Sequence, residues 1–191
     1  MQVDINTYAG IDEVGRGPLA GPVVAAAVVL GDGYEWRGLK DSKMLTPKRR
    51  EACAIEIKDN ALAWAIGRCE PEEIDKYNIF NASLLAMKRA FEGISLATEL
   101  ALVDGKYSPE LSVRSYAVIK GDQHVPAISA ASILAKVTRD LEMCELDESY
   151  PQYGFARHKG YPTTFHIDAL RQYGPCRHHR RSFKPVANVL K

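Results

Sequence analysis

The chain has 191 residues, 46% of them hydrophobic and 26% charged, which is an ordinary composition for a soluble globular protein and a length that suits one domain. The net charge is only +1, and the four cysteines are widely spaced without a Cys-x-x-Cys pair, which argues against a disulfide framework or a structural zinc site. The N-terminus lacks a signal-peptide pattern. The longest apolar run, Pro22 to Leu30, is about half as long as a membrane span. We therefore expect a soluble cytoplasmic protein without membrane association.

The first third of the chain predicts strands followed by a helix. Residues 8–13 and 21–30 indicate two strands around a glycine- and proline-rich turn, and the near-continuous apolar run of the second is typical of a strand buried on both faces. Thr46 and Pro47 supply an N-cap and a first-turn proline for a helix that runs to about residue 58. Residues 61–67 predict a third strand.

Strands and helices alternate in the rest of the chain. A short helix begins at Pro71, and the apolar stripe of a longer one after it consists of Phe80, Leu84, Met87 and Phe91. Residues 100–103 and 116–119 predict two more strands. The core face of the next helix consists of Ala130, Leu134, Val137 and Leu141. A further helix begins at 162–164 and ends at Gly174. These elements predict an α/β sandwich with a mixed sheet of about five strands.

The charge is distributed unevenly along the chain. Residues 151–191 contain eight Lys or Arg and one acid, which gives this segment about +7 and leaves about −6 for residues 1–150. A basic segment joined to an acidic body suits a protein that binds a polyanion beside a carboxylate–metal site, whereas the alternative is a solubilising terminus. Aromatic residues between the charges favour an ordered segment. No repeat or flexible linker interrupts residues 1–191, which predicts a single domain.

Acidic residues stand at the ends of three predicted strands. They are Asp12 with Glu13, Asp104 and Asp122. Ligand sites of open α/β sheets lie at the carboxyl ends of strands, and Mg²⁺ or Mn²⁺ binds carboxylate oxygens. Each acid taken alone also suits a turn or a helix cap. Neighbours on a regular strand face opposite ways, so Asp12 and Glu13 share a site only if the strand is distorted or if ions lie on both sides.

Several motifs together resemble one family. They are Gly10–Val24 (GIDEVGRGPLAGPVV), Leu39–Lys43 (LKDSK), Val103–Gly105 (VDG), Lys120–Asp122 (KGD), Ile128–Asp140 (ISAASILAKVTRD) and His158–Thr163 (HKGYPT). In this order they are similar to the motifs of ribonuclease HII, the type 2 ribonuclease H, in its bacterial form. The resemblance spans nearly the whole chain.

The resemblance implies a fold, an activity and a site. The implied fold is RNase H-like, a mixed five-stranded sheet flanked by helices, with residues from about 142–191 as a basic C-terminal helical extension. The implied activity is hydrolysis of the RNA strand of RNA–DNA hybrids and incision 5′ of single ribonucleotides in duplex DNA, which leaves 3′-hydroxyl and 5′-phosphate ends. The implied cofactor is Mg²⁺ or Mn²⁺, held by the catalytic carboxylates Asp12, Glu13, Asp104 and Asp122.

Other residues are candidates for substrate binding. Gly15, Arg16 and Gly17 offer a backbone that can approach a sugar closely, and the resemblance assigns the reading of the 2′-hydroxyl to them. The matching family tyrosine implies that Tyr161 stacks beside the scissile junction. Candidates for phosphate contacts are Ser42, Lys43 and Lys136. Arg139 and Asp140, one turn beyond Lys136, are interpreted as structural pairing residues, and His124 is a weaker candidate for proton transfer.

Two other functions remain open at this point. The first is a nuclease or recombinase of the same fold that acts on DNA alone and ignores the 2′-hydroxyl. The second is a non-catalytic module that binds hybrids. Residues 185–191 contain no evident aromatic clamp-binding peptide, so recruitment to a sliding clamp is unsupported. No obligate protein partner is evident and nothing in the sequence requires a dimer, so we expect a monomer.

Overall fold

The computed structural model describes residues 7–31, 36, 39 and 45–191. In this part of the chain one five-stranded sheet has the order β3-β2-β1-β4-β5. The strands are β1 (Tyr8–Val14), β2 (Val23–Val29), β3 (Ala63–Cys69), β4 (Leu100–Asp104) and β5 (Arg114–Val118). β2 is antiparallel to β1 and β3, whereas β1, β4 and β5 run parallel. The sheet is therefore mixed, as the sequence predicts.

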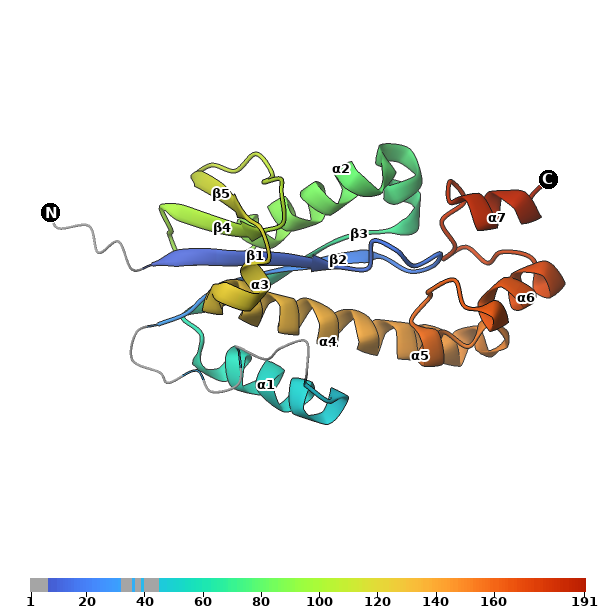
Figure 1. The fold of residues 1–191 in the computed structure, drawn as a ribbon, viewed down its shortest axis with the longest axis horizontal. Coiled ribbons are helices and arrows are strands. Elements are labelled where there is room, and N and C mark those ends of the chain that lie inside the picture. Colours follow the sequence, from blue (N-terminus) through green and yellow to red (C-terminus); the bar gives the residue numbers. More distant parts are fainter. Residues whose placement is uncertain (1–6, 32–35, 37–38, 40–44) are drawn as a thin grey trace, which may run out of the picture.

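Helices cover both faces of the sheet (Figure 1). They are α1 (Pro47–Asn60), α2 (Pro71–Glu92), α3 (Gly121–His124), α4 (Pro126–Ser149), α5 (Phe155–His158), α6 (Thr164–Tyr173) and α7 (Lys184–Val189), with the short 3-10 helix η2 (Pro151–Tyr153) after α4. α2 packs on one face, and α4 with α1 packs on the other. α5, α6 and α7 lie beyond the end of the sheet at which the turn between β1 and β2 is found (Figure 1). None of the helices in the described ranges is long and apolar enough to cross a membrane.

The sheet contacts its helices very closely. All seven residues of β2 are buried, which confirms a strand that is covered on both faces. A Cβ atom on Gly10 of β1 would lie 2.2 Å from the backbone of Ala127, and one on Gly67 of β3 would lie 2.2 Å from the carbonyl oxygen of Ala86. Glycine at these two positions therefore lets α4 and α2 approach the strands and fixes the helices over the sheet.

The local signals in the sequence mark several boundaries correctly. Thr46 caps α1 by accepting a hydrogen bond from the Arg49 amide, and Thr163 caps α6 by accepting one from the His166 amide. α6 ends at Gly174, whose φ of 71° lies in the left-handed region. The two helices predicted after Pro71 form α2, which has a kink at Asn78.

Three details differ from the prediction. β5 begins at Arg114 and ends before Ile119, because its pairing with β4 sets its length and the apolar cluster 116–119 does not. Phe80, two residues after the kink at Asn78, is 38% exposed, and its ring contacts Tyr107 edge-on. Leu141 is 53% exposed. There α4 has passed the sheet, and its buried side faces the C-terminal elements instead.

Buried histidines lie among these C-terminal elements. Burial lowers the pKa of His166 to about 4 and that of His179 to about 3. Because both lie below the ordinary value of about 6.5, the unfolded chain takes up protons first as the pH falls. The stabilisation that depends on these neutral rings is complete above about pH 6.5 and is lost as the pH falls toward 4 and then 3.

We therefore expect the urea midpoint of unfolding to be lower at pH 5 than at pH 7.5. His179→Gln should reduce this difference, whereas Gln172→Asn, an exposed exchange of one uncharged side chain for another, should leave it unchanged. The raised pKa values of Asp12 and Glu13 make the folded chain more stable at pH 5 than at pH 7.5, which opposes the effect of the histidines. The test therefore compares the change in urea midpoint between the two variants. An identical pH dependence in both variants would contradict this assignment.

Candidate active site

Parallel strands bring the acidic residues to one edge of the sheet. β1 and β4 are paired up to Ile11 and Val103, so Asp12 and Asp104 follow the last pair side by side. Asp122 lies in α3, shortly after β5. Its backbone amide donates a hydrogen bond to Oδ1 of Asp104 over 3.2 Å. Three chain segments that are far apart in the sequence therefore meet at this edge, as the strand order requires.

Strand alternation places Glu13 on the opposite face of β1 from Asp12. Ile11 and Val103 face α2, so Asp12 and Asp104, one residue further along, face the side of α4. β1 stays in register with β2 through Glu13 and Val14, and no bulge turns Glu13 to the same face. The Glu13 carboxylate instead pairs with Arg16, 3.3 Å away.

Burial and mutual repulsion make this edge electrostatically unfavourable for carboxylates. Asp12 is 7% exposed, and burial raises its pKa well above the ordinary value, with Glu13 and then Asp104 adding repulsion. A hydrogen bond from Ser132 acts against this shift. Burial also raises the pKa of Glu13, and Arg16 opposes that increase. A cation among these groups would remove the repulsion and favour their charged forms.

The donor chemistry of the four acids fits a hard divalent cation. They offer oxygen ligands only, as Mg²⁺ and Mn²⁺ prefer. Within the described residues, no three His, Cys, Asp or Glu side chains are placed to hold one ion together. Oδ1 of Asp12 accepts from the Glu13 amide, and Oδ1 of Asp104 accepts from the Asp122 amide.

Two fully buried arginines support the loop after β1, which contains Gly15, Arg16 and Gly17. The guanidinium of Arg180 donates to the carbonyl oxygens of Gly15 (2.6 Å), Arg16 (3.1 Å), Gly21 (3.0 Å) and Pro22 (3.1 Å). Burial lowers its pKa to about 9, so it is still a cation at neutral pH. Arg139 donates to the carbonyl oxygens of Ala20, Pro22 and Lys159. The loop after β1 and the segment before Tyr161 are thus connected through buried charge.

Tyr161 lies against this loop. A Cβ atom on Gly17 would be 3.3 Å from Cε1 of Tyr161, so the ring covers the glycine closely. Tyr161 is 43% exposed, and the backbone next to it is joined to the loop by a hydrogen bond from the Leu19 amide to the Gly160 carbonyl. Gly15, Gly17 and Tyr161 are therefore neighbours in the fold, although about 145 residues separate them.

The predicted phosphate contacts have mixed outcomes. Nζ of Lys136 is 2.6 Å from the Asp140 carboxylate, so this lysine has an acidic partner within α4. Ser42 and Lys43 lie outside the described residues. His124 is exposed at the end of α3. Arg139 and Asp140 both have structural partners, but different ones, since Asp140 pairs with Lys136 and Arg139 with carbonyl groups.

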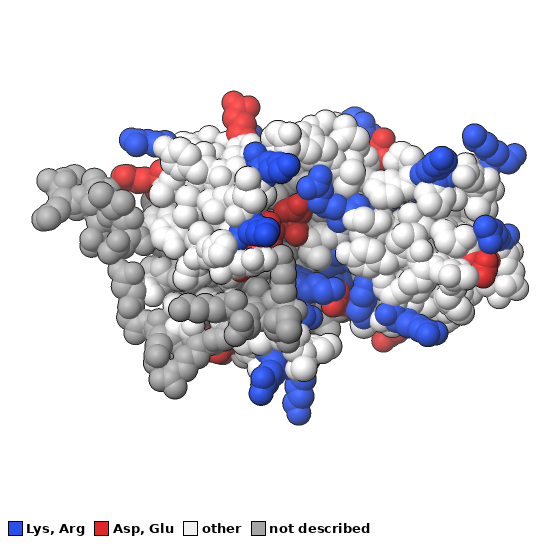
Figure 2. Space-filling model, viewed as in Figure 1, with Lys and Arg blue, Asp and Glu red and all other residues white. Residues whose placement is uncertain are grey.

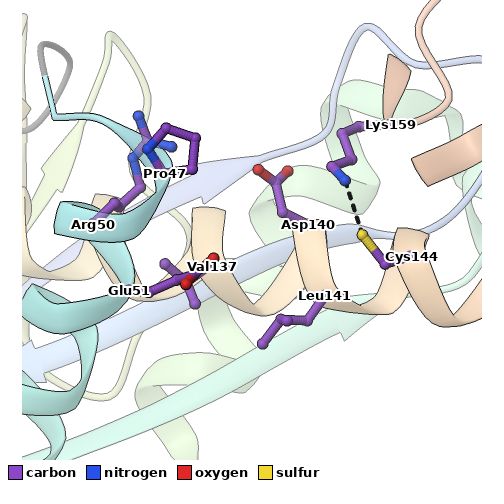
Figure 3. Close-up of a pocket in the computed structure, with 8 residues that line it drawn as sticks. All are labelled: Pro47, Arg50, Glu51, Val137, Asp140, Leu141, Cys144 and Lys159. Atoms are coloured by element: carbon purple, nitrogen blue, oxygen red, sulfur yellow. Dashed lines mark hydrogen bonds between the residues drawn. The ribbon is translucent and has the colours of Figure 1, made fainter. Parts of the chain in front are cut away.

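A small hollow lies between α1 and α4 next to Asp140 (Figure 3). Arg50 and Lys159 contribute basic groups to its lining. The side chain of Lys159 points toward α4 (Figure 3), where its Nζ lies 3.0 Å from Sγ of Cys144; the same Nζ donates to the Ala156 carbonyl.

Figure 2 shows how the charged side chains lie on one face of the molecule. Acidic atoms gather near the middle of the face in Figure 2, with Lys and Arg side chains around them. Among the charged side chains at the end formed by α6 and α7, Lys and Arg are in the majority (Figures 1 and 2). A polyanion that lies across this face would meet basic groups on both sides of the acids.

Sequence reasoning missed the role of Arg180. Its only signal was its position in a run of basic residues, which is indistinguishable from a solvated charge cluster. The burial of Arg180 and its four carbonyl partners arise from contacts with residues about 160 positions away, and no local pattern encodes them.

Comparison with known proteins identifies the fold and the family. The chain matches the family Ribonuclease HII over residues 9–186. It is similar to the crystal structure of ribonuclease H2 from Pyrococcus horikoshii OT3, with a TM-score of 0.82, 28% identity and 96% of each chain covered. RNase HII from Archaeoglobus fulgidus, solved in complex with PCNA, gives a TM-score of 0.77 and 30% identity, with 96% of this chain and 97% of that chain covered.

A more distant likeness concerns the fold alone. Bst-RNase HIII, solved in complex with Mn²⁺, is 19% identical, with a TM-score of 0.78 over 99% of this chain and 70% of that chain. The mixed five-stranded sheet flanked by helices is thus the RNase H-like architecture. The match over residues 9–186 and the two similar structures that cover nearly the whole chain lead to one assignment: the chain belongs to the ribonuclease HII family.

Proposed function

We propose that the protein is a metal-dependent endoribonuclease that hydrolyses the RNA strand of RNA–DNA hybrids and incises 5′ of single ribonucleotides in duplex DNA. The products are 3′-hydroxyl and 5′-phosphate ends. Membership of the ribonuclease HII family supports ribonuclease H activity. The observation that carries the finer proposal is that the acidic edge continues directly into the glycine loop, which Tyr161 covers.

The four carboxylates are the proposed metal ligands and catalytic residues. Asp12, Glu13, Asp104 and Asp122 would hold Mg²⁺ or Mn²⁺, which when bound supplies an activated water and neutralises the charge that develops on the phosphate. Asp12 and Glu13 need a charged form for this, and their burial disfavours it without a cation. A bound cation would offset the cost of burying these two carboxylates in their charged form.

The glycine loop is the proposed reader of the ribose. The 2′-hydroxyl is both a donor and an acceptor, and it distinguishes RNA from DNA at a single nucleotide. Gly17 is exposed and lacks a Cβ, so its backbone can contact that hydroxyl, while the ring of Tyr161 beside it can stack on the adjacent sugar or base. Buried Arg139 and Arg180 keep the loop in place for this contact.

Cleavage-site mapping on three labelled duplexes tests the proposal. One duplex contains a single ribonucleotide, one a long RNA strand, and one only DNA. We expect one cut on the 5′ side of the single ribonucleotide, cuts along the RNA strand, and no cut in the all-DNA duplex. Equal cleavage of all three would support the DNA nuclease instead, and binding without cleavage in the presence of Mg²⁺ or Mn²⁺ would support the binding module.

Salt dependence tests the basic C-terminal segment separately. Residues 151–191 have an excess of about seven positive charges, and each neutralised phosphate contributes about −0.9 to the slope of log K against log salt concentration. We expect a slope steeper than about −3 for hybrid binding, measured by fluorescence anisotropy with a metal-free sample. A flat response would exclude a role of this segment in phosphate binding. The proposal needs no protein partner, and the monomeric state stays a prediction.

A further inference from the structure

A chain of hydrogen bonds runs from the C-terminal segment to the backbone of Tyr161. The Cys176 amide donates to Nδ1 of His179 over 3.0 Å. Nε2 of His179 lies 3.0 Å from Nε2 of His166, and Nδ1 of His166 lies 3.0 Å from the carbonyl oxygen of Tyr161. Both imidazole rings are buried, with 0–1% of their surface exposed.

The donors and acceptors of this chain follow from its two ends. Because Nδ1 of His179 accepts from an amide, the proton of that ring is on Nε2, which donates to Nε2 of His166. His166 therefore carries its proton on Nδ1 and donates it to the Tyr161 carbonyl oxygen, which has no proton of its own. Both neutral rings are thus in one defined tautomer, and each of their four nitrogens takes part in a hydrogen bond.

We propose that His166 and His179 form a relay that positions Tyr161 over Gly17. The relay rests on the proposed function, in which Tyr161 contacts the nucleotide at the scissile junction. His166 and His179 contact neither the acidic edge nor the glycine loop in this scheme, so they are positioning residues that act through Tyr161.

The contacts of Tyr161 explain why its backbone needs this support. Tyr161 is 43% exposed, and its ring lies beside Gly17 at the surface. The residue before it, Gly160, has a φ of 83°, and glycine restricts the backbone conformation little. Hydrogen bonds are therefore needed to fix the backbone conformation at Tyr161. The Tyr161 carbonyl accepts from the Thr163 amide as well as from His166, and the second bond ties it to the protein interior.

Rings and backbone contact both histidines of the pair. The ring of His166 is stacked on His158 at 4.5 Å and meets Phe155 edge-on at 5.5 Å. His179 forms a bridge with Ala20, which follows the glycine loop. The relay therefore connects the two segments that meet at the proposed ribose reader, since His179 is anchored to one and His166 to the other.

Two substitutions at His166 separate the two halves of the relay. The amide nitrogen of Asn is at the position of Nδ1, so His166→Asn keeps the bond to the Tyr161 carbonyl and loses the one to His179. The longer Gln reaches the position of Nε2, so His166→Gln keeps the contact with His179 and loses the bond to Tyr161. Urea unfolding of both variants reports whether they are folded to the same degree.

The readout is kcat/KM on a duplex with one ribonucleotide, in the Tyr161 and Tyr161→Ala backgrounds. With Tyr161 present, we expect His166→Gln to lower kcat/KM about tenfold and His166→Asn by less than about threefold, since small misplacements of a positioning group have effects of this order. In the Tyr161→Ala background, the two variants should have equal rates. Equal rates with Tyr161 present, or a difference that persists without it, would overturn the proposal.

A spectroscopic measurement tests the relay without any cleavage. Long-range ¹H–¹⁵N spectra of histidine-labelled protein distinguish the two neutral tautomers, and we expect a proton on Nδ1 of His166 and on Nε2 of His179. The opposite tautomer in either ring would overturn the proposal, even if the variants fold poorly. Wild-type cleavage of the single-ribonucleotide duplex is measured first and tests the proposed function alone.

Discussion

Replacing Asp104 or Asp122 by Asn is expected to lower metal-dependent cleavage by about a hundred- to a thousandfold, the size of effect that follows when one group that stabilises transition-state charge is lost. Each amide keeps the shape of the carboxylate but removes the negative charge that would hold a cation. Asp104→Asn also keeps an oxygen that can accept the hydrogen bond from the Asp122 amide, so the local fold should survive. The measurement is single-turnover cleavage of a hybrid at saturating enzyme.

Binding separates this prediction from a general loss of structure. Hybrid affinity of both variants, measured without metal, should stay within a few-fold of the wild type. Asp168→Asn is the matched control, because Asp168 is an exposed acid that pairs with Arg171 on α6, and its cleavage rate should be unchanged. Wild-type rates for Asp104→Asn and Asp122→Asn would exclude them as metal ligands.

Arg180→Met is expected to lower the free energy of unfolding by about 3 kcal/mol, because buried carbonyl groups lose their donor and each unsatisfied group costs about 1–3 kcal/mol. Pro22 is partly spared, since Arg139 also donates to its carbonyl oxygen, but Gly15, Arg16 and Gly21 lose the bonds from Arg180. The methionine fills much of the space without a charge. Cleavage should fall as well, because the loop that we propose to read the ribose loses its support.

The neighbouring residue provides the control for this substitution. The side chain of Arg181 is exposed, and its backbone amide donates a hydrogen bond to the Asp75 carboxylate. Arg181→Met should therefore change the free energy of unfolding by no more than about 0.5 kcal/mol in the same urea titration. Equal losses of stability for both variants would show that the buried contacts of Arg180 are not the cause.

Much of the fold was predictable because its signals are local. Thr46 and Pro47 at the start of α1, and Gly174 at the end of α6, act through hydrogen bonds or dihedral angles of adjacent residues. The apolar run of β2 likewise reports burial directly. The prediction that Phe80 and Leu141 lie on buried helix faces was wrong, because their burial depends on a kink in α2 and on the length of the sheet, which are tertiary features.

The candidate site was predictable in part. The parallel order of β1, β4 and β5 brings the segments that carry Asp12, Asp104 and Asp122 to the same end of the sheet, whereas the pairing of Glu13 with Arg16 depends on side-chain geometry. The buried support from Arg139, Arg180 and the histidine pair involves partners far apart in the sequence. The roles of the site residues and the single-domain organisation stay predictions.

The most direct measurement compares two DNA duplexes that differ in a single 2′-hydroxyl at one nucleotide. Both are incubated with the protein and Mg²⁺ or Mn²⁺, and the nick is mapped to the nucleotide. The proposed division between cutting carboxylates and a ribose-reading loop predicts one nick, on the 5′ side of the ribonucleotide and only in the duplex that carries the hydroxyl. Nicking of both duplexes at the same rate, or of neither, would contradict it.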